Sequence, residues 1–352
     1  MAIEVAVVGT GWVGGIRTQA AADNPQVSAL HIAEIRPDRL AEMKALVKPK
    51  SATLDYKELL ANPAIKAVMV STTPEGTHYQ ITKDSLLAGK HVLVEKPIAS
   101  TEDEAEELID LAEKKKLILT VGYSQRFNPR VAFIRKVIQS GEIGEPVTCL
   151  SSRNVTVSLG NKIRGRTKLS LAAMEATHDL DFLLWCLAPR KPIRVYSQVS
   201  GKYLAKTHGP GAPDHQWIMV TLDDGTTVVV GAGAILPVGY PNYCQTWMQI
   251  VGTEGTLSVD DSHHEVTLNT RKNGIQYPMS SMPGEYVMDH TFAGPMATET
   301  NYFIDNITRG KPVMVKPKEA RTVMDIYIAA DISAERNEPV SLPRNARLSD
   351  LK

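Results

Sequence analysis

A glycine-rich turn near the start of the chain constrains its fold most. The apolar run Val5–Val8 leads directly into Gly9-Thr10-Gly11-Trp12-Val13-Gly14, which has the spacing G-x-G-x-x-G. The first glycine allows a sharp bend out of a strand, the second lets the backbone approach a pyrophosphate, and the third lets the next helix pack closely on the strand. The N–H groups at the start of that helix suit a phosphate. The pattern predicts a strand, a turn and a helix that bind a dinucleotide.

An acidic residue at a defined distance supports this interpretation. Glu34 lies in the next apolar stretch, Val27–Ile35, and the fingerprint places an acid about 20 residues after the last glycine. A carboxylate there accepts hydrogen bonds from the adenosine ribose and repels a 2′-phosphate, so NAD is expected rather than NADP. Arg36 and Arg39 keep NADP open because arginine binds phosphate, although stacking on adenine or pairing with Asp38 is an alternative.

The pattern of apolar runs changes near residue 122. With 352 residues, the chain is longer than a domain with a single hydrophobic core usually is. Up to residue 122, short β-branched runs alternate with helical stretches, which indicates a parallel sheet covered on both faces. Beyond it, one helical segment is followed by alternating runs with turn signals such as Asp223-Asp224-Gly225 and then by two late helices, which indicates an antiparallel sheet with helices.

We therefore predict an α/β fold of two domains. Residues 1–122 form a doubly wound Rossmann domain that binds the dinucleotide, and residues 123–352 form an α+β domain with a large open antiparallel sheet for substrate binding and oligomerisation. The helices of the second domain are too few to cover a sheet of seven or more strands on both sides. A homodimer or homotetramer built through that sheet is therefore expected.

Composition excludes several other classes of protein. Lys plus Arg and Asp plus Glu both number 39, so no global field attracts nucleic acid or a membrane. The cysteines are far apart and the pair His263-His264 has no spaced third ligand, so neither a disulfide framework nor a metal site is expected. We see no signal peptide and no membrane span, and expect a cytoplasmic protein with a small-molecule substrate.

A lysine at a strand end is the first candidate for chemistry. The apolar run that begins at His91 ends in Glu95-Lys96-Pro97, and the carboxyl ends of strands in an open α/β sheet face the ligand crevice. A residue before proline is held extended, so Lys96 is fixed locally as well as by packing. A surface lysine before a turn is the alternative for an isolated tripeptide.

Motifs along the whole chain give these residues a context. The sequence resembles the glucose-fructose oxidoreductase and inositol dehydrogenase (Gfo/Idh/MocA) family, because five motifs occur in the order seen there: the glycine turn, Pro74–His78, Ala88–Pro97, Gly122–Phe127 and His178–Asp181. The resemblance implies NAD(P)-dependent oxidation of a secondary alcohol or reduction of a ketone, usually on a sugar, an inositol or a related cyclic diol. It also implies an open-faced second domain that is often buried in dimers or tetramers.

The resemblance implies roles for two residues. Lys96 would donate a hydrogen bond to the substrate oxygen and sense the cofactor, and His178 would be the general acid/base. Loss of hydride from a carbinol requires its hydroxyl proton to leave, and an imidazole with an ordinary pKa near about 6.5 suits that task. A packed or helix-capping histidine is the alternative.

The chain departs from the family beside this histidine. Many members have an aspartate four residues before it, where this chain has Met174. Glu175 lies three residues before His178, on the same face of a helix, and is a candidate to replace the carboxylate, with a solvated helix residue as the alternative. Asp181 is the alternative partner, and we interpret Asp179 as structural.

The remaining candidates come from family analogy, from the glycine fingerprint and from the basic residues that precede His178. Arg126 would lie near the nicotinamide end, with an inter-domain ion pair as the alternative. Arg153 and Arg166 join Lys96 and His178 as candidates for substrate binding, although a solvated basic loop is an alternative. The predicted cofactor-binding set is Gly9, Thr10, Gly11, Trp12, Val13, Gly14, Glu34, Ile35, Arg36, Arg39, Ser71, Thr72, Thr73, His78, Glu95, Lys96 and Arg126.

Two alternative functions stay open at this point. One is a dehydrogenase of a cyclic dihydrodiol or another substrate derived from an aromatic ring. The other is a regulator of the same fold that binds the cofactor without turnover, which the methionine at position 174 motivates.

Overall fold

The chain forms two compact units. A computed structural model describes residues 2–209, 212–240, 244–260, 268–272, 274–276, 285–288 and 291–344. The first unit consists of Met1–Asn128 and Ser281–Arg321, and the second of Pro129–Ser280 and Thr322–Lys352. Compact units need not coincide with domains that fold alone, so the predicted domains 1–122 and 123–352 stay a prediction.

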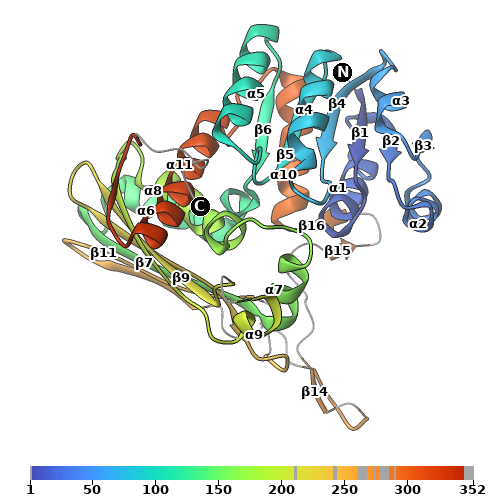
Figure 1. Ribbon diagram of the computed structural model, residues 1–352. Helices are drawn as coiled ribbons and strands as arrows, with labels where there is room; N and C mark the ends of the chain where they lie inside the picture. The colour runs from blue at the N-terminus through green and yellow to red at the C-terminus, as the bar shows by residue number, and fades with distance from the viewer. Residues whose placement is uncertain are drawn as a thin grey trace. The chain divides into compact units, whose positions relative to one another are not determined.

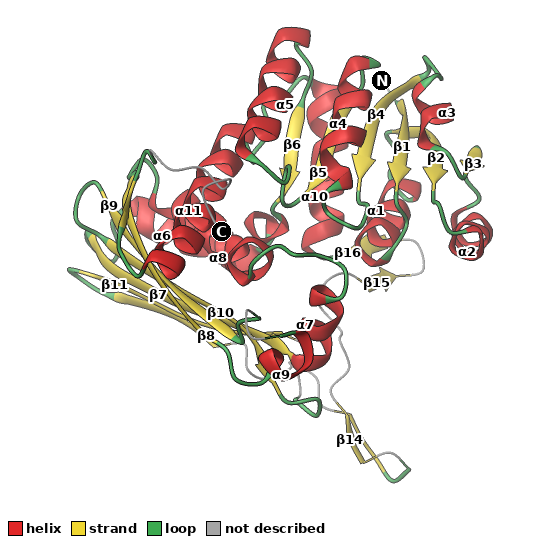
Figure 2. Cartoon of the chain, viewed as in Figure 1, coloured by secondary structure: helices red, strands yellow, loops and turns green. Residues whose placement is uncertain are grey.

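The first unit contains a six-stranded parallel sheet. Its strand order is β3-β2-β1-β4-β5-β6, so the chain builds outward from β1 in both directions, as in a doubly wound fold. Figures 1 and 2 show the arrowheads of β1, β2 and β4 pointing the same way. The predicted Rossmann architecture is confirmed. The strands are β1 (Ile3–Val8), β2 (Val27–Ala33), β3 (Ser51–Thr53), β4 (Ile65–Val70), β5 (His91–Glu95) and β6 (Leu119–Gly122).

Helices cover both faces of this sheet. On one face, Val5, Ile32 and Met69 form a buried core with Phe303 and Ile304 of a late helix, α10. On the other, α4 packs against β4 and β5 and is joined by α5. A helix from near the end of the chain thus completes the first unit. The helices are α1 (Trp12–Ala22), α2 (Pro37–Val47), α3 (Tyr56–Leu60), α4 (Thr77–Leu87), α5 (Glu102–Lys115), the 3₁₀ turn η1 (Ser124–Phe127) and α10 (Pro295–Arg309).

Local signals fix the ends of α5. The Thr101 side chain accepts from the N–H of Glu104, and the Glu104 carboxylate accepts in return from the N–H of Thr101, which is a capping box. Acidic residues fill the first turn and lysines the last, in agreement with the helix dipole.

The second unit is built on a seven-stranded sheet. The order is β12-β11-β7-β10-β9-β8-β17. All neighbours pair antiparallel except β7 and β10, which are parallel. The predicted large antiparallel sheet is confirmed, with this one parallel pair. The strands are β7 (Pro146–Thr156), β8 (Pro192–Ser200), β9 (His215–Leu222), β10 (Thr227–Leu236), β11 (Cys244–Gly252), β12 (Thr256–Asp260) and β17 (Val340–Ser341).

One face of this sheet carries helices, and on the other face described side chains of β9 are exposed to solvent. Along β9, Gln216, Ile218 and Val220 are buried, whereas Trp217 and Met219 between them are 43% and 46% exposed. The helices of this unit are α6 (Pro129–Ser140), α7 (Val157–Arg164), the π-helical turn η2 (Ala172–Ala176), α8 (Thr177–Leu187), α9 (Leu204–His208) and most of α11 (Pro317–Arg336). The chain also forms two hairpins, β13–β14 (Leu268–Thr270, Gly274–Gln276) and β15–β16 (Glu285–Met288, Thr291–Ala293).

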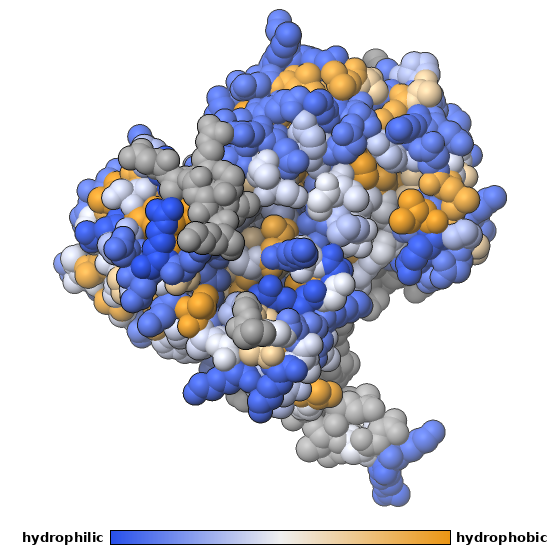
Figure 3. All heavy atoms as spheres, viewed as in Figure 1, coloured by the Kyte–Doolittle hydropathy of each residue, from blue (hydrophilic) through white to orange (hydrophobic). Residues whose placement is uncertain are grey.

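The visible surface is mainly hydrophilic (Figure 3). On the face seen in Figure 3, hydrophilic residues cover most of the surface and apolar residues form small separate patches. Among the helices in the described ranges, none is long and apolar enough to cross a membrane.

Candidate functional site

The glycine turn has the geometry that its spacing predicts. Gly9 has φ of 82°, and a Cβ there would lie 2.7 Å from the carbonyl oxygen of Ser71. A Cβ on Gly14 would lie 1.8 Å from the carbonyl oxygen of Gly9, so α1 touches the turn itself. By contrast, a Cβ on Gly11 would meet no atom within 4 Å. The first and third glycines permit close packing, and the second leaves backbone open to a ligand.

Glu34 lies just past β2, against this turn. Its Oε2 accepts from the N–H of Thr10 at 2.8 Å and from the Thr10 hydroxyl at 3.1 Å, and its Oε1 accepts from the N–H of Arg36 at 3.1 Å. The residue is only 7% exposed. The carboxylate is therefore fixed at the carboxyl edge of the sheet beside the turn.

The two arginines that could bind the 2′-phosphate of NADP, Arg36 and Arg39, make different contacts. Arg39 donates from Nε to the carbonyl of Thr10 at 2.7 Å and pairs through Nη1 with Glu42 at 2.6 Å, so it braces the turn. Arg36 is mostly exposed, with its Nε 3.7 Å from Glu34. Of the other predicted cofactor residues here, Trp12 and Ile35 are exposed and Val13 is half-buried.

The residues after β4 lie against the same turn. Ser71 is buried, and within the described part of the chain its hydroxyl has no hydrogen-bond partner. Thr72 bonds through its hydroxyl to that of Thr77 at 2.6 Å, while Thr73 is exposed. His78 is buried, with Nδ1 2.8 Å from the carbonyl oxygen of Pro97 and Nε2 3.0 Å from that of Thr72. His78 thus ties the segment after β4 to the segment after β5.

Lys96 directly follows β5 and is partly exposed. Its neighbour Glu95 points into the unit, where Oε1 accepts from Nε of Arg17 at 2.9 Å. Arg17 is 1% exposed and also contacts Glu299 of α10. Burial opposes its charge, yet the two carboxylates raise the pKa of Arg17 above its ordinary value. Sequence reasoning missed Arg17, for which the available signal was a charged residue among the small and apolar residues of α1.

Arg126 is almost fully buried in the first unit. Its Nη1 donates to Glu319 at 2.6 Å and to the carbonyl of Met314 at 3.1 Å. Both partners come from the late segment that belongs to the same unit. The guanidinium therefore holds that segment to the end of β6, and its predicted place near a nicotinamide stays a prediction.

In the second unit, His178 lies in the first turn of α8, directly after the π-helical turn η2. Every residue from 171 to 183 is buried except His178, which is partly exposed. Isolated π turns inside helices are frequent at functional sites. The imidazole is thus the side chain of this segment that reaches solvent.

The π turn changes the relation of the neighbouring residues to His178. The α-helical spacing that put Glu175 on its face does not apply through η2, where bonding runs from i to i+5. Met174 and Glu175 are both buried, at 2% and 8% exposure. Asp181 is fully buried one α-helical turn after His178, so its spacing argument stands. The roles of Glu175 and Asp181 remain predictions.

Asp179 and Arg153 form a buried pair. Asp179 accepts from the hydroxyl of Ser151 at 2.7 Å and from Nε of Arg153, whose Nη1 lies 3.1 Å from Sγ of Cys244. Burial opposes the charge of Arg153, but Asp179 raises the pKa of the guanidinium well above its ordinary value. This agrees with a structural Asp179. Arg166 is exposed in the turn after α7, and the substrate roles of both arginines stay predictions.

A second polar cluster of this unit was not predicted. Gln216 accepts from the N–H of Ala172, at the start of η2, and donates to Asp331 of α11, both at 3.2 Å. Burial raises the pKa of Asp331 to about 6, against the hydrogen bonds from Ser170 and Gln216 and the charge of Arg164, which lower it. Burial also lowers the pKa of Arg164. The cluster links α11 and β9 to the turn that precedes His178.

The first unit fits a dinucleotide cofactor. The open space at Gly11, the fixed carboxylate of Glu34 and the buried, unpaired hydroxyl of Ser71 within the described residues lie around one turn at the carboxyl edge. This is where doubly wound sheets bind their ligands. Among the residues that the structure describes, no group of His, Cys, Asp and Glu has a metal-binding arrangement.

The predicted residues therefore fall into two sets, one in each unit. The glycine turn, Glu34, Ser71, His78 and Lys96 gather at the carboxyl edge of the first sheet. His178, Glu175, Asp181 and Arg153 gather around η2, α8 and β7.

Comparisons with known proteins cover both sets. Residues 3–123 match an oxidoreductase family with an NAD-binding Rossmann fold (GFO_IDH_MocA), and residues 131–258 match the GFO/IDH/MocA C-terminal domain. The myo-inositol 2-dehydrogenase of Thermotoga maritima is 23% identical over 341 residues, which are 97% of this chain and 98% of that protein.

Two solved structures share the fold over nearly their whole length. The scyllo-inositol dehydrogenase of Lactobacillus casei, with bound NAD(H) and scyllo-inositol, has a TM-score of 0.82 at 21% identity and covers 97% of this chain and 99% of its own. The myo-inositol 2-dehydrogenase of Lactobacillus plantarum has a TM-score of 0.85 at 18% identity, with the same coverage.

Proposed function

Because this chain belongs to the Gfo/Idh/MocA family of oxidoreductases with an NAD-binding Rossmann fold, we propose that it transfers hydride between NAD and a secondary alcohol or ketone of a sugar, glycoside or cyclitol. The observation that carries the proposal is the exposure of His178 alone in the otherwise buried segment 171–183. The relatives named as inositol dehydrogenases support a polyol.

The chemistry divides between two side chains. A nicotinamide cofactor, when bound, supplies the hydride acceptor or donor. His178 takes the proton of the hydroxyl group as the alcohol becomes a ketone, and returns it in the reverse direction. Lys96 donates a hydrogen bond to the same oxygen and stabilises the negative charge that develops there. Asp181, one helical turn from His178, or Glu175 orients the imidazole.

The residues around the glycine turn support NAD over NADP. A 2′-phosphate would approach the fixed carboxylate of Glu34, which repels it. Arg39 is engaged with the turn and with Glu42, and Nε of Arg36 lies 3.7 Å from Glu34, so each arginine already faces a carboxylate. We therefore propose NAD as the cofactor.

A nicotinamide absorbance screen tests the proposal. Purified protein is offered NAD with inositols, aldoses, glycosides and cyclic dihydrodiols, and Lys96→Ala and His178→Ala serve as comparison variants. We expect turnover of at least one polyol by the wild type and a loss of about 10²- to 10⁴-fold in either variant. Full turnover by both variants would remove the mechanism.

The same screen examines the alternatives. Buried Met174, in place of the family carboxylate, favours a regulator that binds the cofactor without turnover. Cofactor binding with no turnover of any substrate would support that function. Turnover of cyclic dihydrodiols alone would instead support a dehydrogenase of substrates derived from aromatic rings.

We also propose a homodimer or homotetramer formed through the open face of the second sheet. Tyr196, Trp217 and Met219 project from neighbouring strands of that face and are 36% to 46% exposed, and exposed apolar patches of this kind mark interaction sites. Size-exclusion chromatography with light scattering tests this. A wild-type monomer at micromolar concentration would contradict the proposal. The double variant Trp217→Glu, Met219→Glu should be a monomer, because two charges would then lie in the interface.

A further inference from the structure

Arg17 joins three elements of the first unit at one buried guanidinium. It lies in α1, one turn after the third glycine. Nε donates to Oε1 of Glu95 at 2.9 Å, and Nη2 contacts the same oxygen. Nη2 also donates to Oε2 of Glu299 at 2.6 Å, and Nη1 donates to the hydroxyl of Thr300 at 3.1 Å. The glycine-turn helix, the end of β5 and α10 therefore meet at this side chain.

The charges of this cluster depend on one another. Arg17 is 1% exposed and Glu299 2% exposed, so water screens their charges poorly. A buried carboxylate that loses its cation becomes an uncompensated charge in a medium of low dielectric constant. Removing Arg17 would leave Glu95 and Glu299 facing each other with like charge. Glu95, whose side chain is 14% exposed, has a route outward to water.

Gly122 leaves room for the cluster because it has no side chain. A Cβ on Gly122, at the end of β6, would lie 2.9 Å from both Nη2 of Arg17 and Oε1 of Glu95. A side chain at position 122 would overlap the ion pair. The adjacent strand end is thus shaped around the contact between Arg17 and Glu95.

We propose that Arg17 is a positioning residue for hydride transfer. By holding Glu95 it fixes the end of β5, and with it the backbone of Lys96, relative to the helix that follows the glycine turn. The planar guanidinium reaches two carboxylates and a hydroxyl at fixed angles, which a lysine ammonium on a flexible chain does not reproduce. The inference rests on the proposed function, in which Lys96 contacts the reacting oxygen.

The first experiment needs neither cofactor nor substrate. Hydrogen exchange by mass spectrometry is compared for wild type, Arg17→Met and Lys90→Met. Lys90 is the matched control because it is a buried cation at the other end of β5. We expect Arg17→Met to speed exchange in residues 93–99 at least about tenfold relative to β1, and Lys90→Met to change this ratio less than about twofold. An equal increase in β1 and in residues 93–99 of the Arg17 variant would overturn the positioning role.

The second experiment is a kinetic cycle with Lys96. We expect Arg17→Lys to lower kcat about 10- to 100-fold, as a misplaced catalytic group does, with a change in KM for the cofactor of less than about threefold. In the Lys96→Ala background the same substitution should change kcat less than about threefold, because the two residues act as a unit. Equal losses in both backgrounds would overturn the proposal.

A milder variant covers the case that Arg17→Met does not fold. Thr300→Val removes only the hydroxyl that Arg17 contacts, and it should speed exchange in residues 93–99 more than in β1. Uniform exchange in this variant would count against the inference. Local loosening in a protein that turns over no substrate would support the positioning of the strand end and contradict the proposed function.

Discussion

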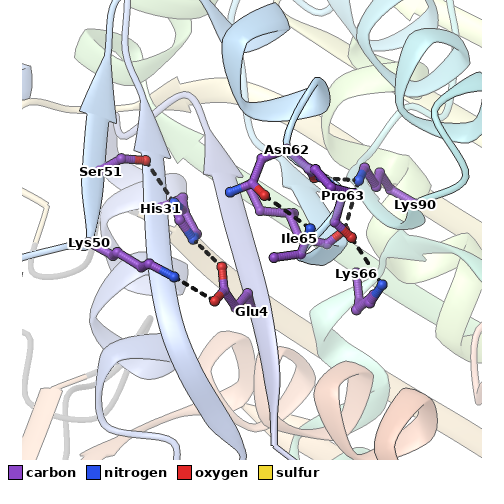
Figure 4. A network of polar contacts seen from close by, with 10 residues as sticks. Glu4, His31, Lys50, Ser51, Asn62, Pro63, Ile65, Lys66 and Lys90 are labelled. Carbon is purple, nitrogen blue, oxygen red and sulfur yellow. Dashed lines mark hydrogen bonds and ion pairs between the residues drawn. The ribbon is translucent and has the colours of Figure 1, made fainter.

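The residues directly before and after strand β5 are both lysines, and they lie in different surroundings. At the amino end, Lys90 is buried and donates from Nζ to the carbonyl oxygens of Asn62 at 2.7 Å and Ile65 at 2.9 Å (Figure 4). At the carboxyl end, Lys96 reaches solvent in the region where the buried hydroxyl of Ser71 has no partner among the described residues. Lys90 is buried and bonded to two carbonyl oxygens, whereas Lys96 is partly exposed at the carboxyl edge of the sheet, where we propose that the cofactor binds. Burial therefore distinguishes two lysines of the same motif.

A second network of the first sheet follows the structural pattern. Nε2 of His31 lies 3.0 Å from Glu4 and Nδ1 lies 2.7 Å from the hydroxyl of Ser51, while Lys50 bonds to Glu4 at 2.6 Å (Figure 4). The hydrogen bonds from Lys50 and His31 lower the pKa of Glu4. Each ring nitrogen of this buried histidine lies within hydrogen-bond distance of a side chain, so its polar groups are used within the fold.

The largest effect should separate the two lysines by turnover. Lys96→Ala removes the proposed donor to the substrate oxygen and should lower kcat about 10²- to 10⁴-fold, while the melting temperature changes little because the side chain is partly exposed. Lys90→Met should leave kcat per folded molecule within about twofold. Steady-state rates and thermal melts of both variants check this. A large loss of kcat in Lys90→Met with little loss in Lys96→Ala would contradict this prediction.

The effect of burial on a polar group can also be tested at Asp331 of the second unit. Burial raises its pKa to about 6 from an ordinary 3.8, so the native state keeps a proton that the unfolded chain has lost. Its contribution to stability is complete below about pH 4 and is lost as pH rises through about 6, a change of up to about 3 kcal/mol. Asp331→Asn should therefore be the more stable protein at about pH 8 and show a smaller change with pH.

Urea titrations at several pH values measure this difference. If the wild type instead gained free energy of unfolding relative to Asp331→Asn as pH rose from about 4 to about 8, the fold would stabilise the charged carboxylate of Asp331. The prediction would then be wrong.

Stability should show the role of the amino end. Lys90→Met keeps a similar volume but leaves the carbonyls of Asn62 and Ile65 without their donor, which should lower the free energy of unfolding by about 2 kcal/mol. Because burial lowers the pKa of Lys90, a neutral methionine relieves part of that desolvation and limits the loss. Chemical denaturation measures it, and an unchanged midpoint would show that Lys90 is not structural.

The smallest effect concerns the choice of cofactor at the carboxyl end. Glu34→Gln keeps an acceptor for Thr10 but removes the charge, so the affinity for NADP relative to NAD should rise about tenfold. Glu113→Gln, at an exposed carboxylate of α5 that pairs with Lys318, is the matched control and should leave the ratio unchanged. Fluorescence titrations with both reduced cofactors give the two constants. An equal shift in both variants would mean that Glu34 does not select the cofactor.

Much of the first unit could be predicted from local signals. The apolar runs Val5–Val8, Val27–Ile35 and the run from His91 to Glu95 correspond to β1, β2 and β5, since buried parallel strands are continuous apolar runs. β3 was missed because it has three residues. In the second unit the late helices and the turn at Gly225 were predicted, but α7 and the π turn before His178 were not.

The candidate site divides in the same way. The glycine turn, Glu34 and Lys96 are visible because their spacing follows from one strand, one turn and one sheet edge. The partners of Arg17 and Arg126 are not visible, since they include residues 95, 299 and 319, and no local periodicity relates positions so far apart. The support for Glu175 also weakened, because a π turn alters spacing without an obvious sequence signal.

The sequence alone determined that this chain has a Rossmann unit with a dinucleotide turn, a second unit with a large sheet, and a lysine and a histidine in the pattern of one oxidoreductase family. The tertiary structure decided that α10 completes the first unit, that Arg17 ties Glu95 to the glycine-turn helix, and that Lys90 is buried against the carbonyl groups of Asn62 and Ile65. The physical reason is range. Turns, caps and periodicity act over a few residues, whereas burial and the pairing of charges depend on which distant segments the folded chain brings together.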